Sequence, residues 1–292
     1  MDKKKRIIIQ SIAALAQNAN FKGFFTGKIY DGKAKSVCVP GLNCYSCPGA
    51  VGACPIGSLQ NALSGYRFKL PYYVVGLLLF FGVLVGRLIC GFLCPFGLLQ
   101  DLLHHVPFPV KLKRFRADKW LRMVKYVVLV VLVIVLPICV KLTPFFCKYL
   151  CPSGTVSGLL LALGDRGLFQ AFGGLFAWKA CILGIIVLAS VVIARPFCKY
   201  LCPLGAIYGP LNKVSIYHLE CDPSKCISCG KCSSVCDMCV DPSKDPNSAE
   251  CIRCLRCVHE CPAKALSPRD GVSGSFRKFF LKRKAGEEKN LE

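Results

Sequence analysis

Three long apolar runs constrain the fold of this chain more than any other feature. Residues 71–86, 126–140 and 180–194 carry no charged side chain, and each run ends at an Arg or a Lys. Each run is somewhat short for the about 20 residues that cross a bilayer as a helix, so the flanking cations would extend toward water. With 54% hydrophobic residues, the chain is predicted to be an α-helical membrane protein, with spans at residues 70–90, 122–142 and 176–196.

A fourth apolar segment, near the N-terminus, is interrupted by polar side chains. Gln10 and Gln17 are seven residues apart, so they fall on one stripe of a helix and can face other helices. Basic residues gather at the N-terminus, at residues 111–125 and near the C-terminus, as is typical of cytoplasmic flanks. We therefore expect four spans, the first at residues 7–25, in a multi-pass cell membrane protein with both termini in the cytoplasm. An amphipathic helix on the membrane surface is the alternative for the first segment.

Charge and cysteine content exclude two other classes of protein. The 38 Lys and Arg outnumber the 16 Asp and Glu, which gives a net charge of +22. Because these cations lie between apolar runs, membrane lipid rather than nucleic acid is the expected partner. A disulfide scaffold is a short and polar secreted domain, whereas this chain is long and apolar. Its 22 regularly spaced cysteines therefore indicate metal binding.

A Cys-Pro-x-Gly tetrad recurs four times, beginning at Cys54, Cys94, Cys151 and Cys202. The last three tetrads are preceded, four residues earlier, by a second cysteine: Cys90, Cys147 and Cys198. Proline suits the first position of a helix, where its missing N–H group costs nothing, so the cysteine before it would cap that helix. The capping thiolate would then face free backbone N–H groups and the positive helix end, which stabilise an anionic cluster.

Alternating spans would bring these cysteines together at the two sides of the membrane. The cytoplasmic side receives one cluster's complement of four thiolates: Cys90, Cys94, Cys198 and Cys202. The outer side receives six cysteines, of which the preferred ligands of an outer cluster are Cys44, Cys47, Cys147 and Cys151. The alternative set lies entirely in the first outer loop: Cys38, Cys44, Cys47 and Cys54. A disulfide among some of these outer cysteines also stays open.

The C-terminal cysteines give the strongest signal in the chain. Two runs of three cysteines, each followed by a fourth, have the spacing of a bacterial two-cluster ferredoxin. Because the fourth cysteine ligates the other cluster, we expect one [4Fe-4S] cluster at Cys226, Cys229, Cys232 and Cys261. The second is expected at Cys251, Cys254, Cys257 and Cys236. Asp237 replaces the proline that usually follows Cys236, so Cys239 stays open as an alternative ligand.

These features divide the chain into three regions. Residues 1–210 are expected to form a transmembrane domain with the Cys-x3-Cys-Pro motifs. Residues 211–268 are expected to form a small α+β ferredoxin-like domain with two clusters. Residues 269–292 are expected to be a basic, disordered tail.

The Cys-x3-Cys-Pro pairs at helix ends, combined with a two-cluster domain, resemble a family of membrane-bound 4Fe-4S polyferredoxins. It includes the quinol dehydrogenase membrane subunit of periplasmic nitrate reductases and the membrane part of the nitrous-oxide reductase maturation flavoprotein. The resemblance covers about residues 70–268. It implies that the cytoplasmic pairs and the eight ferredoxin cysteines bind clusters. The outer cysteines look like a subgroup found in anaerobic bacteria, in which a flavin-carrying partner would replace the quinone.

The expected function is transmembrane electron transfer through iron-sulfur clusters. Electrons would move between the cytoplasmic ferredoxin-type domain and a quinone pool or an extracytoplasmic redox protein, with a flavoprotein or a ferredoxin as partner. A membrane-anchored redox sensor or a factor for metalloenzyme assembly is the alternative. We expect no catalytic residue, since electron transfer needs no acid-base or acyl chemistry. The chain also carries no nucleotide-binding glycine motif and no flavin fingerprint. As an oxidoreductase, it would be an electron-transfer subunit.

Overall fold

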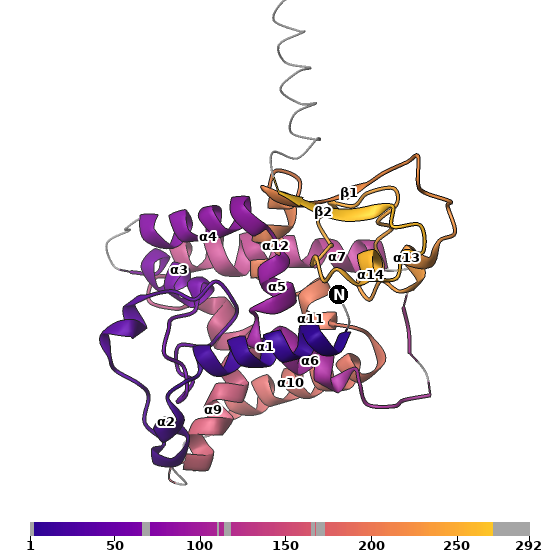
Figure 1. The fold of residues 1–292 in the computed structure, drawn as a ribbon. Coiled ribbons are helices and arrows are strands. Elements are labelled where there is room, and N and C mark those ends of the chain that lie inside the picture. Colours follow the sequence, from indigo (N-terminus) through magenta and orange to yellow (C-terminus); the bar gives the residue numbers. More distant parts are fainter. Residues whose placement is uncertain are drawn as a thin grey trace, which may run out of the picture.

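The computed structural model describes residues 3–65, 71–109, 111–113, 118–164, 167 and 173–270. Within these ranges the chain is mostly helical, and a small part with two strands lies at one end (Figure 1). The first helices are α1 (Lys3–Gln17), α2 (Phe21–Thr26), the 3-10 helix η1 (Lys33–Ser36), α3 (Pro55–Leu63), α4 (Tyr72–Val85), α5 (Leu88–Phe92) and α6 (Pro95–Leu103). The following helices are α7 (Asp118–Val127), the π-helix η2 (Val128–Val135), α8 (Leu136–Cys139), the π-helix η3 (Phe146–Leu150), α9 (Pro152–Gly164), α10 (Gly174–Val192), α11 (Pro196–Tyr200) and α12 (Pro203–Leu211).

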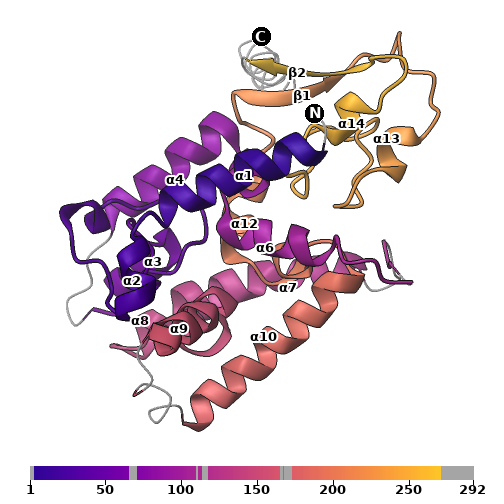
Figure 2. The same cartoon turned by 60° about the horizontal axis from the view of Figure 1, so that its bottom comes forward.

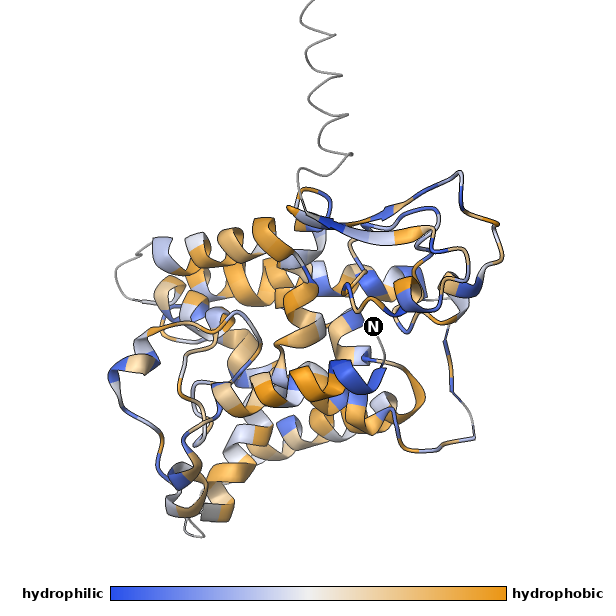
Figure 3. Ribbon diagram, viewed as in Figure 1, coloured by the Kyte–Doolittle hydropathy of each residue, from blue (hydrophilic) through white to orange (hydrophobic). Residues whose placement is uncertain are grey.

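Two helices among the described residues are long and apolar enough to cross a membrane. They are Asp118–Cys139, which joins α7, η2 and α8 into 22 residues, and Gly174–Val192 with 19 residues. Their large apolar side chains face outward, and the exposed fraction is 62% for Ile185 and 71% for Leu188. The apolar colouring runs along α4 and α10 in Figure 3. Exposed apolar helix faces of this extent are what contact with lipid requires.

The expected first span at residues 7–25 is wrong as one continuous helix. The chain breaks after Gln17, where the Asn18 side chain donates a hydrogen bond to Ala14 O (2.9 Å). Asn20 then donates to Pro48 O (2.8 Å), which ties the break to a neighbouring loop. The polar stripe does face inward, because Gln10 is 1% exposed while Ile12 is 62% exposed.

The expected span at residues 70–90 also ends early. Helix α4 stops at Val85 because Gly86 has a φ of +56°, a left-handed conformation that favours glycine. A β-carbon at Gly86 would lie 2.3 Å from Asn212 Oδ1, so this turn also needs the space. Residues 66–70 lie outside the described residues. The spans expected at 122–142 and 176–196 coincide with the helices Asp118–Cys139 and Gly174–Val192, which are long and apolar enough to cross a membrane.

The C-terminal part is a two-stranded antiparallel sheet with two short helices. Strand β1 (Tyr217–Cys221) pairs with β2 (Leu266–Asp270), so that Tyr217 lies opposite Asp270. The helices are α13 (Lys231–Ser234) and α14 (Arg256–His259), and Figure 2 shows them beside the sheet. The tail expected at residues 269–292 lies outside the described residues from residue 271 onward.

Buried ion pairs and hydrogen bonds fix the C-terminal part on the helices. Glu250 accepts hydrogen bonds from Arg87 (3.1 Å) and from Lys125 of α7, and both of these cations are 0% exposed. Arg253 donates to Val85 O at the end of α4 (3.0 Å) and is also 0% exposed. A buried cation is stable only when it is paired, so these contacts hold the two parts in one arrangement.

Candidate metal centres

Four cysteines from two distant segments converge inside the helical part. Cys90 lies on α5 and Cys94 caps α6, while Cys198 lies on α11 and Cys202 caps α12. All four are buried, with exposed fractions of 5% or 6%. Burial raises the pKa of Cys202, and the nearby thiolates of the other three cysteines raise it further. We call these four residues the inner site.

The capping cysteines have the local geometry that the Cys-Pro-x-Gly tetrad predicts. Cys94 and Cys202 have extended backbones, with ψ of 115° and 114°, and proline opens the helix that follows each of them. Burial raises the pKa of the Cys94 thiol, and the backbone amides of Leu42 and Gly97 oppose this rise. The tetrad glycine acts in the same way in the other three tetrads. The helix ends therefore offer N–H groups to anionic sulfur.

Two buried arginines cross over between the halves of the inner site. Arg87 precedes the Cys90 pair, yet its guanidinium donates to Cys198 O (3.3 Å). Arg195 precedes the Cys198 pair and donates to Cys90 O (2.6 Å). Asp101 accepts two hydrogen bonds from Arg195, at 2.8 and 2.5 Å. The positive charges favour a cluster with four thiolates, which carries negative charge.

Tetrad glycines make room for these arginines. A β-carbon at Gly97 would lie 3.1 Å from Cys90 O and 3.3 Å from Arg195 Nη1. A β-carbon at Gly205 would lie 3.0 Å from Arg87 Nη2. The last position of the tetrad is therefore small because a cation and a carbonyl approach it closely.

Gln100 adds a hydrogen bond to the inner site. Its Nε2 donates to Cys198 Sγ (3.2 Å), and its Oε1 accepts from the backbone of Phe197 (3.1 Å). Hydrogen bonds to cluster sulfurs set reduction potentials, so Gln100 would tune this site.

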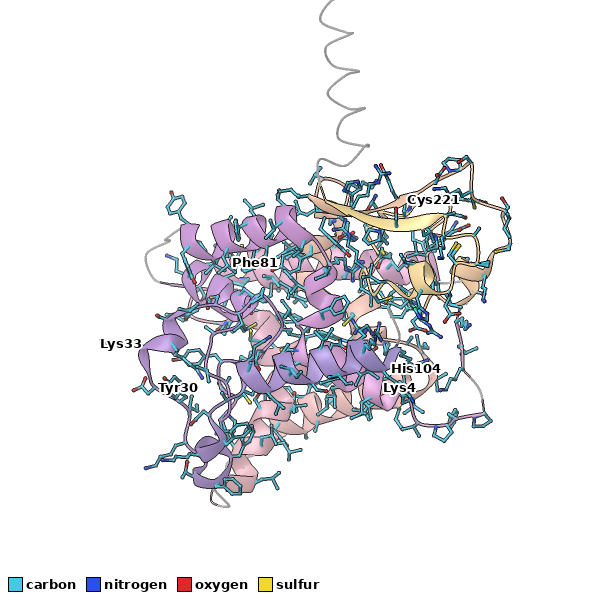
Figure 4. The ribbon with its side chains drawn as sticks, in the orientation of Figure 1. Lys4, Tyr30, Lys33, Phe81, His104 and Cys221 are labelled. Atoms are coloured by element: carbon cyan, nitrogen blue, oxygen red, sulfur yellow. The ribbon has the colours of Figure 1, made fainter. Side chains whose placement is uncertain are left out.

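The C-terminal part surrounds two further hollows with cysteines. The first ferredoxin site is lined by Cys226, Cys229, Cys232 and Cys261. The second ferredoxin site is lined by Cys236, Cys251, Cys254 and Cys257. The structure thus groups each run of three with the distant fourth cysteine of the other run. Figure 4 shows Cys221, which also borders the first hollow, at the end of the molecule opposite Tyr30 and Lys33.

Cys236 rather than Cys239 faces the second ferredoxin site. Burial raises the pKa of Cys236 to about 11, and the neighbouring Cys254 thiolate adds to this rise. Cys239 instead directs its Sγ to Lys113 O (2.7 Å), toward the helical part. Asp237, which replaces the usual proline, forms an ion pair with Arg256 (2.9 Å).

A third group of cysteines lines a cavity of about 560 Å³ on the other side of the inner site. We call it the outer site; its members are Cys44, Cys54, Cys147 and Cys151. All four residues line this one cavity, and burial together with the nearby thiolates of Cys54 and Cys44 raises the pKa of Cys147. Lys179 of α10 also borders the cavity.

The outer site differs from both sets that the sequence favoured. Cys47 lines a different cavity, near Ser157, because the turn from Cys44 O to Cys47 N (3.0 Å) turns the chain away. Cys38 lies 3.4 Å from Ser58 Oγ and does not line the outer site. Cys54 takes the place that the preferred set gave to Cys47.

The arrangement of the thiols suits clusters better than single ions. Among the described residues, no three His, Cys, Asp or Glu side chains lie close enough together to bind one metal ion. The cysteines of these sites have free thiols. A single zinc ion needs all four sulfurs gathered around one centre, whereas each iron of a cubane takes one sulfur, so thiols that stand apart around a hollow fit a cubane better.

Sequence reasoning missed several residues that shape these sites. Glu250 and Lys179 gave no signal, because each acts across a contact between distant segments. Gln60 and Gln100 did leave a signal in the sequence, because each lies six residues after a capping cysteine. Gln60 Oε1 accepts from Cys147 N (3.2 Å), much as Gln100 accepts from Phe197.

Comparisons with known proteins show that part of the chain belongs to an iron-sulfur binding domain. Three segments, residues 70–116, 124–168 and 175–217, match the 4Fe-4S binding domain family. An uncharacterized protein of Methanocaldococcus jannaschii is 25% identical over 73% of this chain and 76% of its own length. The putative electron transport protein YccM of Escherichia coli is 28% identical over 62% of this chain and 50% of its own length.

The ferredoxin-type protein NapH of Haemophilus influenzae is 27% identical over 65% of this chain and 64% of its own length. The chain thus spans half to two thirds of YccM and NapH. No solved structure matches it. Together, these matches show that the chain carries the 4Fe-4S binding domain in three segments and is similar to ferredoxin-type electron transport proteins.

Proposed function

We propose that this protein carries electrons across a cell membrane, between a cytoplasmic ferredoxin-type domain and a quinone or a redox protein at the outer side. The domain, residues 211–268, would hold two [4Fe-4S] clusters at the first and second ferredoxin sites. The inner site of the membrane domain, residues 1–210, would hold another. When bound, such clusters supply one-electron transfer. The chain's own residues position these sites and exclude water between them.

The observation that carries this proposal is the contact between the second ferredoxin site and the inner site. Gly91, next to Cys90, lies against Ile252, and a β-carbon at Gly91 would lie 2.5 Å from Ile252 O. Asn212 of the segment after α12 donates to Cys251 O (2.7 Å). Backbone that carries ligands of one site thus packs directly on backbone that carries ligands of the other.

Arg87 links the same two sites through charge. Its guanidinium contacts Cys198 O at the inner site and Ala249 O (2.6 Å), two residues before Cys251. Burial acts to raise the pKa of Glu250, but the charges of Arg87 and Lys125 hold it below its ordinary value. Glu250 therefore stays ionised and balances the buried cations in the junction.

Contacts at the ferredoxin end support a topology with both termini in the cytoplasm. Lys113 donates to Ser234 O (2.8 Å), which brings the basic loop to the same side. Figure 1 shows the N-terminus next to the C-terminal part. The proposed topology has four crossings, by α1, α4, α7 to α8 and α10, and among the described residues only the last two are helices long and apolar enough to span by themselves.

Metal content tests the proposal. The full chain would be purified anaerobically in detergent, and iron and acid-labile sulfide would be counted per chain. We expect at least about twelve irons, and about four fewer after serine replaces the four cysteines of the inner site. The matched control replaces Cys139 and Cys181, which are exposed on helices, and should retain all iron. About eight irons in every preparation would refute the conduit and favour a sensor or an anchor.

A further inference from the structure

The outer site repeats the construction of the inner site. We propose that Cys44, Cys54, Cys147 and Cys151 bind an additional [4Fe-4S] cluster, which forms the solvent-accessible end of the electron path. This inference rests on the proposed function, because it supplies the terminus that the conduit needs. It also changes the ligand set that spacing alone favoured, since Cys54 replaces Cys47.

Helix capping is the first shared feature. Cys54 caps α3 with a ψ of 127°, and Pro55 opens that helix. Cys151 has a ψ of 111° before Pro152, which opens α9. Two capping cysteines thus face each other at the outer site, as Cys94 and Cys202 do at the inner site.

A glutamine six residues after a capping cysteine is the second shared feature. At the inner site Gln100 accepts a hydrogen bond from Phe197 N, one residue before Cys198. At the outer site Gln60 accepts one from Cys147 N (3.2 Å). Gln60 is 0% exposed, and its Nε2 donates to Leu132 O (2.8 Å), so its amide is fully oriented. In both sites the glutamine joins the two halves.

A cation on the carbonyl of the first cysteine is the third shared feature. Lys179 Nζ donates to Cys147 O (3.4 Å), as Arg195 does to Cys90 O. The tetrad glycine, Gly154, again lies between them. A β-carbon there would be 3.5 Å from Lys179 Nζ and 3.9 Å from Cys44 Sγ. Three independent features of the inner site therefore recur with the same chemistry.

The outer site obtains its fourth thiol in a different way. Ala50 occupies the position four residues before Cys54 where the other tetrads have a cysteine. Cys44, from the preceding loop, lines the cavity instead. The same loop touches the inner site, because a β-carbon at Gly41 would lie 3.2 Å from Cys94 Cα. One short segment thus contacts both sites.

A buried aromatic ring lies between the two sites. Tyr208 is 0% exposed and its hydroxyl donates to Pro40 O (3.2 Å). Burial raises the pKa of Tyr208, and thiolates of both sites, Cys90 and Cys94 at one and Cys54 at the other, raise it further. Tyr208 belongs to the same buried core as Cys54, Cys90 and Cys94, so the space between the two sites is filled with packed protein.

Cluster binding at the outer site needs no chemistry beyond ligation. Each thiol gives up its proton to solvent and displaces one ligand that held an iron of the incoming cluster, so four bonds form as four break and no iron changes its oxidation state. Tyr45, Ser46 and Asn61 line the same cavity, and Tyr45 is 50% exposed. A redox partner can therefore approach the outer site from solvent.

Three single variants of the full chain test the ligand set: Cys44→Ala, Cys54→Ala and, as the matched control, Cys47→Ala. Iron and sulfide would be counted per chain, and Mössbauer and EPR spectra of the reduced protein recorded. We expect about sixteen irons in the wild type and the control, and about four fewer, with one cluster signal missing, in both Cys44→Ala and Cys54→Ala. Intact signals from the ferredoxin sites would show that a variant is folded.

Two outcomes would overturn the proposal. Loss of about four irons in Cys47→Ala but not in Cys54→Ala would show that Cys47, and not Cys54, is a ligand of the outer cluster. About twelve irons in every protein would show that no outer cluster exists. The proposed function would survive that second result, because the variant of the inner site tests it separately.

Discussion

The inner and outer sites use the same parts in different surroundings. Each has two capping cysteines, a glutamine that joins its halves and a cation on a cysteine carbonyl. At the inner site the cations are arginines with exposed fractions of 0% and 1%, and their carboxylate partners are buried with them. At the outer site the cation is one lysine, at the edge of a cavity of about 560 Å³.

This difference indicates how one motif serves two roles. A closed site with internally balanced charge suits a relay that exchanges electrons only with neighbouring sites, since water and foreign reductants cannot enter. An open site with a single cation suits exchange with a partner. The tetrad fixes the ligands, and the residues around it determine access.

The largest expected effect distinguishes the two kinds of cation. Arg195→Met removes a buried charge that pairs with Asp101, and breaking a buried ion pair costs about 3 to 5 kcal/mol. We expect a lower unfolding temperature in detergent and the loss of about four irons. Lys179→Met is the matched change at the outer site, and it should retain both the iron and the unfolding temperature. Equal losses of iron and of unfolding temperature in the two variants would show that the two cations have the same role.

Alanine substitutions of the tetrad glycines compare how tightly the inner and outer sites are packed. Gly97→Ala places a methyl group 3.1 Å from Cys90 O, so we expect a cost of about 1 to 3 kcal/mol from overpacking. Gly154→Ala has its nearest neighbour at 3.5 Å, an ordinary contact, and should be tolerated. Denaturation followed by loss of cluster absorbance measures both. A tolerated Gly97→Ala would show that the inner site is not tightly packed.

The two glutamines should separate a redox effect from a structural effect. Gln100→Leu removes the hydrogen bond to Cys198 Sγ, so the reduction potential of the inner site should fall by about 40 mV, the equivalent of about 1 kcal/mol for one electron. Gln60 donates to a backbone carbonyl instead, and Gln60→Leu should lower stability without that shift. Redox titration monitored by EPR would decide. An unchanged potential in Gln100→Leu would exclude the tuning role.

The smallest expected effect concerns access from solvent. Ferricyanide is an anion, so its reaction with the reduced outer site should be favoured by Lys179 and should slow as salt is added. A charge at the edge of a solvent-filled cavity contributes only about 1 kcal/mol, so we expect a change of about fivefold at most. Stopped-flow oxidation of wild type and Lys179→Met measures it. The same salt dependence in both proteins would mean that Lys179 does not face the partner.

Ligands that belong to a regular sequence motif could be predicted more reliably than a ligand that a single turn brings to its site. The ferredoxin spacing predicted which cysteines surround each hollow, because the pattern of this motif also assigns the distant fourth cysteine. The tetrads predicted the helix caps, because a cap depends on local backbone geometry. The choice between Cys47 and Cys54 could not be made from spacing, since a single turn at residues 44–47 decides which thiol faces the cavity. The break after Gln17 was also hidden, because it depends on contacts with a distant loop.

The central claim is that electrons cross the protein through the inner site. The direct test encloses ferricyanide in sealed vesicles that contain the purified chain, and adds dithionite outside as an impermeant reductant. We predict that the wild type bleaches the enclosed ferricyanide and that a Cys90→Ala/Cys198→Ala variant does not, although its ferredoxin clusters remain. The claim would be contradicted if fully loaded wild type left the ferricyanide oxidised, or if the variant reduced it equally fast.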